Sequence, residues 1–322
     1  MKLIADSGST KTDWCLIDNA HIVCQFKTEG INPFVQTDAM ITPVLSSAAR
    51  QLLGAGDRRE RNGQMVSQHS SLDEIHFYGS GIRPEMQPRM EKLLSDAFGF
   101  KGVKGVKGFK EVKGVEELHT TISLSRIPLT ICTYSDLLGA ARALCGNNEG
   151  IVCILGTGSN SCLYDGREIV ANIPPLGYIL GDEGSGAVLG KMFIGALFKH
   201  QLPETLRQQY LDESRLQLSD IIDRVYRQPL PNRWLAATTP FIHRHLDCEP
   251  LQQLVIDNFR AFLRRNVHPY CRPALPVNAI GGMAHYFAPQ FRQALELEQL
   301  TCGTILQSPM PGLIAFHSRT NR

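Results

Sequence analysis

The chain begins with an alternation of apolar runs and small polar residues that predicts a β-hairpin. Apolar residues at 3–5 and 14–17 flank a turn of glycine, hydroxyl-bearing and charged residues at 6–13. Short apolar runs separated by turn-forming residues are typical of paired strands. We therefore expect a hairpin whose tip is made of small residues.

A second copy of this pattern lies near the middle of the chain. Residues 154–160 again place Gly-Ser after an apolar run, and 162–165 repeats the Cys-Leu-x-Asp order of 15–18. Each copy predicts a strand, a glycine turn, a second strand, a tight turn and a third strand. An internal repeat separated by nearly half the chain predicts two similar lobes whose glycine tips face one another across a cleft.

Elsewhere the pattern alternates predicted strands with predicted helices, which favours an α/β fold. Apolar strands are expected at 21–27, 75–79 and 129–133. Helices are expected at 39–53, 84–98, from 137 onward, across much of 193–262 and at 311–317, with a strand, a diglycine turn and a helix at 277–286. The polar stretch 54–71 is expected to be a surface connection, and the lysine–glycine repeat at 101–110 a solvated loop.

Composition narrows the class of protein. The 322 residues are 43% hydrophobic with a net charge of +2, so the chain can form substantial cores and has no general attraction to nucleic acid or membranes. No apolar segment reaches 18 residues, and no signal-peptide core follows Met1, so we expect a cytoplasmic protein. The nine cysteines form no Cys-x-x-Cys pair and are expected to be reduced and mostly buried.

The first hairpin has the residue types of a phosphate site. Gly8 lets the backbone bend, and the peptide N–H groups with nearby hydroxyls form a concavity suited to phosphate oxygens. Asp6 would then hold Mg²⁺, directly or through water. The alternative is a plain hairpin tip in which Asp6 caps its own turn. Because Gly156 replaces the acid in the second copy, we expect one metal-holding and one bare phosphate hairpin around a nucleoside triphosphate.

Four further motifs suggest site residues, and the first three of them each allow two interpretations. Asn32, between Gly30 and Pro33, could bind a sugar hydroxyl or form an Asx turn. Asp136 precedes a helix-forming stretch and is either a cap or a catalytic base. Asp182, enclosed by glycines, could accept bonds from a sugar or cap a helix. The diglycine turn at 281–282 could lie flat against adenine or ribose.

Taken together, these motifs resemble a known family, the N-acetylglucosamine kinase-like proteins grouped with BadF/BadG/BcrA/BcrD-type ATPases. That family belongs to the wider superfamily of sugar kinases, heat-shock chaperones and actin. The resemblance covers almost the whole chain outside 54–71 and 101–126. Its motifs are Asp-Ser-Gly-Ser-Thr-Lys-Thr-Asp (6–13), Gly-Ile-Asn-Pro (30–33), Ser-Asp-Leu-Leu-Gly-Ala-Ala-Arg-Ala (135–143), Leu-Gly-Thr-Gly-Ser-Asn-Ser (155–161), Gly-Asp-Glu-Gly-Ser-Gly (181–186) and Gly-Gly-Met-Ala (281–284).

The resemblance implies two ribonuclease H-like (actin-like ATPase) lobes, each a central mixed sheet with helices, around an ATP and sugar cleft. The lobes would be 1–133, joined by a terminal helix at 310–322, and 134–309. The implied activity is transfer of the γ-phosphate of ATP to a hydroxyl of an amino sugar, with N-acetylglucosamine favoured and the 6-phosphate as product. The implied partners are small molecules, and a homodimer is common among relatives.

The resemblance also implies roles for individual residues. Asp136 becomes the catalytic base and Asp6 the Mg²⁺ ligand. The residues implied to bind ATP are Asp6, Gly8, Ser9, Thr10, Lys11, Thr157, Gly158, Ser159, Gly281 and Gly282. Those implied to contact the sugar are Asn32, Asp136, Thr157, Gly158, Gly177 and Asp182.

Two other functions fit parts of the pattern. Some relatives are ATPases that drive electron transfer with an iron–sulfur cluster, which requires cysteines at a subunit interface. The apolar setting of the thiols argues against that function. A non-catalytic sugar sensor is the other alternative, and the intact pair of Asp6 and Asp136 argues against it.

Overall fold

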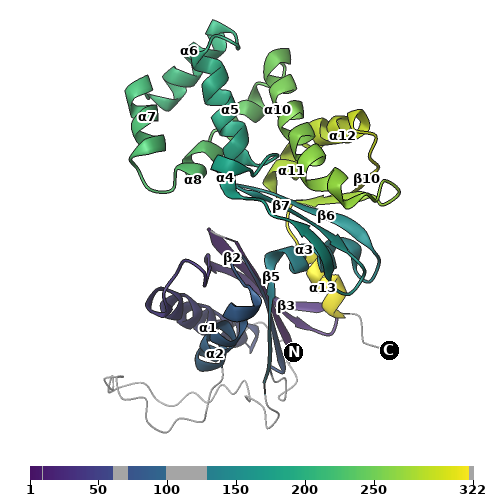
Figure 1. Cartoon of the computed structure of the whole chain (residues 1–322). Coiled ribbons are helices and arrows are strands. Elements are labelled where there is room, and N and C mark those ends of the chain that lie inside the picture. Colours follow the sequence, from purple (N-terminus) through teal and green to yellow (C-terminus); the bar gives the residue numbers. More distant parts are fainter. Residues whose placement is uncertain (9, 61–71, 99–128, 319–322) are drawn as a thin grey trace. The chain divides into compact units, whose positions relative to one another are not determined.

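The computed structural model describes residues 1–8, 10–60, 72–98 and 129–318, and contacts divide the chain into two compact units (Figure 1). Unit 1 comprises Met1–Gly139 and Met310–Arg322, and unit 2 comprises Ala140–Pro309. The division follows Gly139 inside a helix, whereas we expected a boundary after residue 133. The lysine–glycine repeat at 101–110 lies outside the described residues.

Unit 1 is built on a five-stranded sheet in the order β3-β2-β1-β4-β5. The strands β1 to β3 are antiparallel, while β4 and β5 run parallel to β1. The elements of unit 1 are β1 (Lys2–Ser7), β2 (Lys11–Asp18), β3 (His21–Glu29), α1 (Asp38–Glu60), β4 (Glu74–Gly79), η1 (Pro84–Met86), α2 (Gln87–Phe98), β5 (Thr130–Ser135), the start of α3 (Asp136–Cys145) and α13 (Met310–Ser318).

Both faces of this sheet are covered, which explains the continuous apolar run of β1. Leu3 and Ala5 point to the face where α1 and α2 pack, and they share one buried cluster with those helices. On the opposite face, Tyr78 of β4 bonds to His317 of α13 with 2.9 Å between the hydroxyl oxygen and Nε2. Asp6 pairs with Tyr78 in the parallel register and therefore lies on that second face.

Unit 2 repeats the topology of unit 1. Its sheet has the order β10-β9-β6-β7-β8, with β6 to β8 antiparallel and β9 and β10 parallel to β6. The strands are β6 (Gly150–Leu155), β7 (Ser159–Tyr164), β8 (Ile169–Ile173), β9 (Val277–Ile280) and β10 (Cys302–Leu306). The predicted internal repeat is thus a repeat of structure, with one central mixed sheet and flanking helices in each unit.

Unit 2 differs from unit 1 by a large helical segment between β8 and β9. Its helices are α4 (Gly177–Leu180), α5 (Gly186–Phe198), α6 (Glu204–Ser214), α7 (Leu218–Tyr226), α8 (Pro231–Ala236), α9 (Thr239–Arg244), α10 (Glu249–Phe262), the π-helix η2 (Leu263–Val267) and the short η3 (His268–Tyr270), followed after β9 by α11 (Gly282–Tyr286) and α12 (Ala288–Leu297). The core joins α5, α10 and α12 to the sheet.

Most predicted elements are present, and their limits differ by a few residues. The clearest difference is α1, which continues to Glu60 into the stretch that we expected to be a connection. Of the nine cysteines, all free, only the strand residues Cys15, Cys153 and Cys162 are buried, whereas five are half-buried and Cys271 is exposed, so the expectation that most are buried is wrong. Within the described residues, no helix is both long enough and apolar enough to cross a membrane.

Substitution of Phe259 measures how much its packing contributes to the attachment of α10 in unit 2. Its side chain is fully buried and its ring centre lies 5.2 Å from that of Phe291 on α12. We expect Phe259→Ala to lower the free energy of unfolding by about 3–5 kcal/mol, because the substitution removes buried contacts and leaves a cavity. Urea unfolding followed by circular dichroism measures this change.

The matched control is Tyr226→Ala, which removes an aromatic ring that is 77% exposed on α7. This substitution should change the free energy of unfolding by no more than about 0.5 kcal/mol. Equal effects of the two substitutions would contradict the packing described here.

Candidate active site

The hairpin predicted near the start of the chain is formed by β1 and β2, and it is tied to the loop that follows β3. The N–H of Gly8 donates to the carbonyl of Lys11 across the tip (3.0 Å). Behind the tip, the buried Ser7 hydroxyl lies 2.7 Å from that of Thr12, and it also exchanges hydrogen bonds with the backbone of Ile31. The hairpin and the loop at 30–36 therefore form one hydrogen-bonded unit.

Asp6 and Asp136 form a pair of neighbouring carboxylates. Asp6 is the penultimate residue of β1, and Asp136 opens α3 at the end of β5. Burial, followed by the negative charge of Asp136, raises the pKa of Asp6 to about 7. A cation beside Asp6 would relieve this repulsion, and Mg²⁺ prefers carboxylate and phosphate oxygens. The residues present thus fit a magnesium ion carried by a nucleotide.

The helix cap of α3 is Ser135 rather than Asp136. The Ser135 hydroxyl accepts a bond from the N–H of Leu138 (3.2 Å), which is the bond expected of a helix cap. Asp136 accepts instead from the Ser80 hydroxyl at Oδ2 (2.9 Å) and from the N–H of Leu137 at Oδ1 (2.9 Å). Burial raises the pKa of Asp136 even though both bonds favour the charged form. The side chain is therefore available for a role beyond capping.

Asn32 forms the Asx turn that was one of its two interpretations. Its Oδ1 accepts from the N–H of Phe34 (3.0 Å). Its side-chain amide nitrogen makes no hydrogen bond within the described residues, so it can still donate to a ligand. The turn is held by Arg89 of α2, which donates to the carbonyls of Pro33 (2.5 Å) and Gln36 (2.9 Å).

In unit 2, the second hairpin is packed against the loop at 181–186. The N–H of Gly156 donates to the carbonyl of Gly158 across the tip (2.9 Å), and the N–H of Gly186 donates to the carbonyl of Gly156 (2.8 Å). A Cβ at Gly158 would lie 3.1 Å from a carboxylate oxygen of Asp182. The structure thus brings together two motifs that are distant in sequence.

The diglycine turn also reaches this hairpin. Gly281 has φ +118°, and a Cβ there would lie only 2.3 Å from the carbonyl oxygen of Leu155. Only glycine allows this approach. Gly282 follows as the first residue of α11, and the nearest atom to a Cβ there would be Cδ2 of Tyr286 at 3.9 Å, an ordinary contact distance.

Asp182 does not cap α5, because Ser185 accepts from the N–H of Val188 (3.1 Å) and is the cap. The Asp182 carboxylate accepts instead from the backbone N–H groups of Ser159 and Gly177. Burial raises the pKa of Asp182 to about 6, although these two bonds oppose the rise. The hydroxyl of Ser159 is buried without a hydrogen-bond partner among the described residues. An unsatisfied buried hydroxyl next to a carboxylate is suited to a polar ligand.

Helix α10 and the π-helix η2 that continues it supply supporting residues that the sequence analysis missed. Asn258 is fully buried, and its carboxamide accepts from the N–H of Gly184 (2.9 Å) and donates to the carbonyl of Ser185 (3.2 Å). Arg265, in the π-helix, pairs with Glu183 at 2.6 Å. One Asn and one Arg in an amphipathic helix carry no local signal, so only the tertiary fold identifies them.

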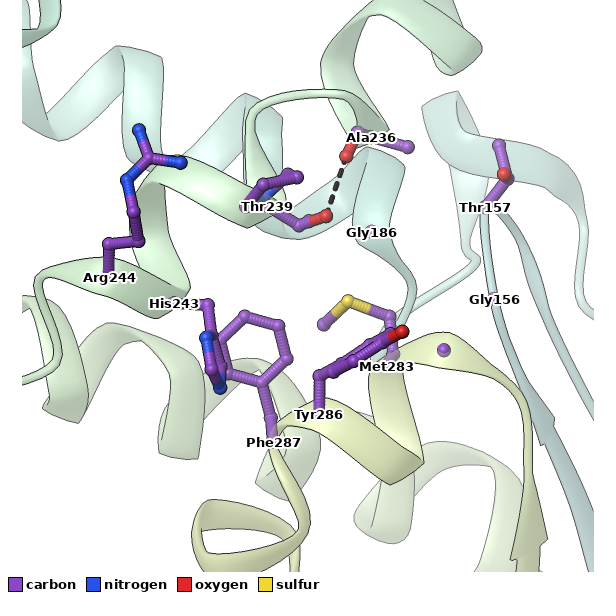
Figure 2. A pocket seen from close by; sticks show the side chains of 12 residues that line it. Gly156, Thr157, Gly186, Ala236, Thr239, His243, Arg244, Met283, Tyr286 and Phe287 are labelled. Atoms are coloured by element: carbon purple, nitrogen blue, oxygen red, sulfur yellow. Dashed lines mark hydrogen bonds between the residues drawn. The ribbon is translucent and has the colours of Figure 1, made fainter. Parts of the chain in front are cut away.

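A pocket of about 650 Å³ opens in unit 2 beside the tip of the second hairpin (Figure 2). The side chains of α8 and α9 line one side of it, and those of α11 line another. His243 is exposed and borders this pocket, with its ring centre 5.4 Å from that of Phe287. The lining residues are Gly156, Thr157, Gly186, Ala236, Thr239, Pro240, His243, Arg244, Gly282, Met283, Tyr286 and Phe287.

The predicted site residues therefore gather in two groups. Around the ends of β1 and β5, unit 1 gathers Asp6, Gly8, Thr10, Lys11, Asn32 and Asp136. Around the end of β6, unit 2 gathers Thr157, Gly158, Ser159, Gly177, Asp182, Gly281 and Gly282. Ser9 lies outside the described residues, and Lys11 forms an ion pair with Asp13 (2.8 Å).

The described residues contain no group of three or more His, Cys, Asp and Glu side chains arranged to hold a metal ion. Burial raises the pKa of Cys162 to about 12, so its thiol stays protonated near neutral pH.

Comparisons with known proteins extend these observations. No protein-family model and no curated protein matches the chain. Among solved structures, that of a putative N-acetylglucosamine kinase from Chromobacterium violaceum is 18% identical over 98% of each chain, with a TM-score of 0.61. A glucokinase from Balamuthia mandrillaris in complex with glucose is 12% identical over 98% of this chain and 92% of that chain, with a TM-score of 0.53. At these identities the likeness is one of fold.

A third solved structure is far more similar. It is that of a putative N-acetylglucosamine kinase from Porphyromonas gingivalis, with a TM-score of 0.82 to this chain. The predicted α/β class with two actin-like ATPase lobes is confirmed, whereas the grouping with BadF-type ATPases stays a prediction. With 45% identity over 99% of both chains, the chain belongs to the same family as the Porphyromonas gingivalis protein.

Proposed function

We propose that this protein is an ATP-dependent kinase of an amino sugar, with N-acetylglucosamine as the substrate and its 6-phosphate as the product. The observation that carries the proposal is the position of the Asp136 carboxylate at the start of α3, beside Asp6. Because Ser135 caps this helix, the Asp136 carboxylate is not needed for capping. Membership of a family that includes a putative N-acetylglucosamine kinase supports the choice of sugar.

Asp136 is proposed as the general base. Its carboxylate takes the proton of the sugar hydroxyl while that oxygen forms a bond to the γ-phosphorus of ATP. The bond from the γ-phosphorus to the bridging β–γ oxygen breaks, and ADP leaves with that electron pair. The protein's contribution is chiefly to position these groups and to neutralise charge.

Asp6 and the first hairpin are proposed to hold the metal and phosphate end of the nucleotide. Bound Mg²⁺ supplies positive charge to the phosphate oxygens. Asp6 would hold the ion. Phosphate oxygens would be contacted by the backbone N–H groups of Gly8, Ser9 and Thr10, by the hydroxyls of Ser9 and Thr10, and by the Lys11 ammonium.

Unit 2 is proposed to bind the remainder of ATP and part of the sugar. The pocket beside Gly282 has the volume and the largely apolar lining typical of small-molecule sites, and we assign it to adenosine. Thr157, Gly158 and Ser159 would contact phosphate oxygens or the sugar. In unit 2 the Asp182 carboxylate and Gly177 are the proposed sugar contacts, and in unit 1 the proposed contact is the Asn32 side chain.

The first test is ADP release from Mg²⁺-ATP with N-acetylglucosamine and a panel of amino sugars and hexoses. We expect stimulation by one amino sugar and a loss of about 10²–10⁴-fold in kcat for Asp136→Asn, because general-base help is removed. Binding of ATP, measured by calorimetry, should be largely retained in the variant. Asp96→Asn, an exposed carboxylate on α2, is the matched control and should keep wild-type turnover.

Hydrolysis of ATP that no sugar stimulates would contradict the kinase assignment and favour a different ATPase. Sugar binding without any turnover would favour a sensor. Full turnover by Asp136→Asn would remove Asp136 as the base while leaving the kinase assignment in place.

The adenosine assignment is tested by filling the pocket. Ala236 borders it, and the next residue, Ala237, does not. We expect Ala236→Phe to raise KM for ATP by about tenfold, which corresponds to about 1.4 kcal/mol of binding free energy, with little change in KM for the sugar. Ala237→Phe should leave both values near wild type, so a selective effect on sugar KM from Ala236→Phe would show that the pocket serves the sugar instead.

The role of Asp182 predicts a pH dependence. Its pKa of about 6 means that the carboxylate is ionised, and able to accept two hydroxyl bonds, only above that pH. KM for the sugar should therefore rise as the pH falls through about 6, since protonation converts an acceptor oxygen into a donor. Steady-state kinetics at saturating Mg²⁺-ATP measures this. In Asp182→Asn the sugar KM should be higher and nearly independent of pH, and a pH profile parallel to wild type would exclude the role.

A further inference from the structure

A small-residue turn at 79–81 has no role in the reaction as described so far, although it lies at the centre of the unit 1 site. It follows β4, which lies between β1 and β5 in the sheet. In the parallel register, Gly79 is the partner of both Ser7 and Ser135. The turn therefore starts between the end of the strand that carries Asp6 and the start of the helix that carries Asp136.

Ser80 bonds to both of these neighbours. Its N–H donates to the carbonyl of Ser7 (2.9 Å), which continues the sheet ladder by one residue and fixes its backbone. Its hydroxyl donates to Oδ2 of Asp136 (2.9 Å). A hydroxyl held by the backbone of β1 thus sets the position of a carboxylate on α3.

The two bonds to Asp136 together determine the plane of its carboxylate. The N–H of Leu137 occupies one lone pair of Oδ1, and the Ser80 hydroxyl occupies one lone pair of Oδ2. Because the first bond comes from the adjacent residue, it moves with the helix and cannot fix the carboxylate relative to β1. The bond from Ser80 is the one that links the carboxylate to the hairpin side of the site.

Gly81 connects the same turn to the Asn32 loop. It has φ +76°, and a Cβ there would lie 2.1 Å from Oδ1 of Asn32 and 3.0 Å from Cβ of Phe34. The absence of a side chain at 81 lets the Asx turn of Asn32 pack directly on this segment.

We propose that Ser80 is a positioning residue, which orients the Asp136 carboxylate toward the sugar hydroxyl, and that Gly81 seats the Asn32 loop beside it. The inference rests on the proposed kinase function and adds residues that act through Asp136 and Asn32. The turn then sets the relative placement of the base, the end of β1 and the sugar loop.

The test compares Ser80→Ala with Ser80→Thr. We expect Ser80→Ala to lower kcat by about tenfold or more with little change in either KM, because a misplaced base slows the chemical step without weakening binding. Ser80→Thr keeps the hydroxyl and should retain most of kcat. Thermal melting of both variants separates this effect from general destabilisation, since a merely structural role would lower the melting temperature and kcat together.

A double-mutant cycle isolates the action through Asp136. In the Asp136→Asn background, Ser80→Ala should cause little further loss of kcat, because the carboxylate it positions is already gone. Gly81→Ala should give a different kinetic signature, a rise in KM for the sugar that exceeds any change in KM for ATP.

Three outcomes decide the inference. An active wild type with unchanged kcat in Ser80→Ala overturns this inference alone. Equal losses from Ser80→Ala in the wild-type and Asp136→Asn backgrounds also overturn it, because they show that Ser80 does not act through Asp136. A wild-type chain that phosphorylates no sugar overturns the proposed function, and this inference with it.

Discussion

The site depends on one constraint, which is that the central strands of each sheet are buried on both faces. Leu3, Ile4 and Ala5 are fully buried, and so are Val152 and Cys153 in the second sheet. With the faces covered by helices, polar groups can reach a ligand mainly at the carboxyl ends of the parallel strands. In unit 1 these are the ends of β1, β4 and β5, and in unit 2 those of β6, β9 and β10. Every candidate motif follows one of these ends or packs against one.

This constraint explains why much of the fold and part of the site could be predicted from the sequence. The two hairpins are local, since an apolar run followed by Gly and Ser is visible in a short window, and their repetition indicated two similar units. The competition between capping and function could not be resolved locally, because Ser135 and Asp136 are adjacent good caps. The structure assigns the capping bond to Ser135, whose hydroxyl accepts from the Leu138 N–H, and the catalytic role of Asp136 stays a proposal.

The supporting residues were beyond sequence reasoning for a physical reason. Asn258 bonds to a loop more than 70 residues away in sequence. It supports that loop because its side chain is buried and both polar atoms of its carboxamide are hydrogen-bonded. The pocket residues of α8 and α9 likewise lie in amphipathic helices without glycine or acidic motifs. The extension of α1 to Glu60 was missed because its last turns are polar and glycine-containing, which locally is typical of a connection.

The two hairpins have the same strand pairing but carry different residues at the position of Asp6. Asp6 remains inside β1, paired with Tyr78 of β4, where the neighbouring Asp136 makes the region electronegative and suited to a cation. Ile4 and Val152 each pair with the cysteine of the repeated Cys-Leu-x-Asp sequence, so Ile154 is equivalent to Asp6, and the expectation that Gly156 replaces the acid is wrong. Gly156 follows β6, accepts the Gly186 N–H through its carbonyl and borders the pocket. A carboxylate at 156 would bring negative charge to the wall of that pocket, close to Asp182. Under the proposed function, the acids and the metal would therefore belong to the hairpin of unit 1, and close backbone approach to the nucleotide would belong to the hairpin of unit 2.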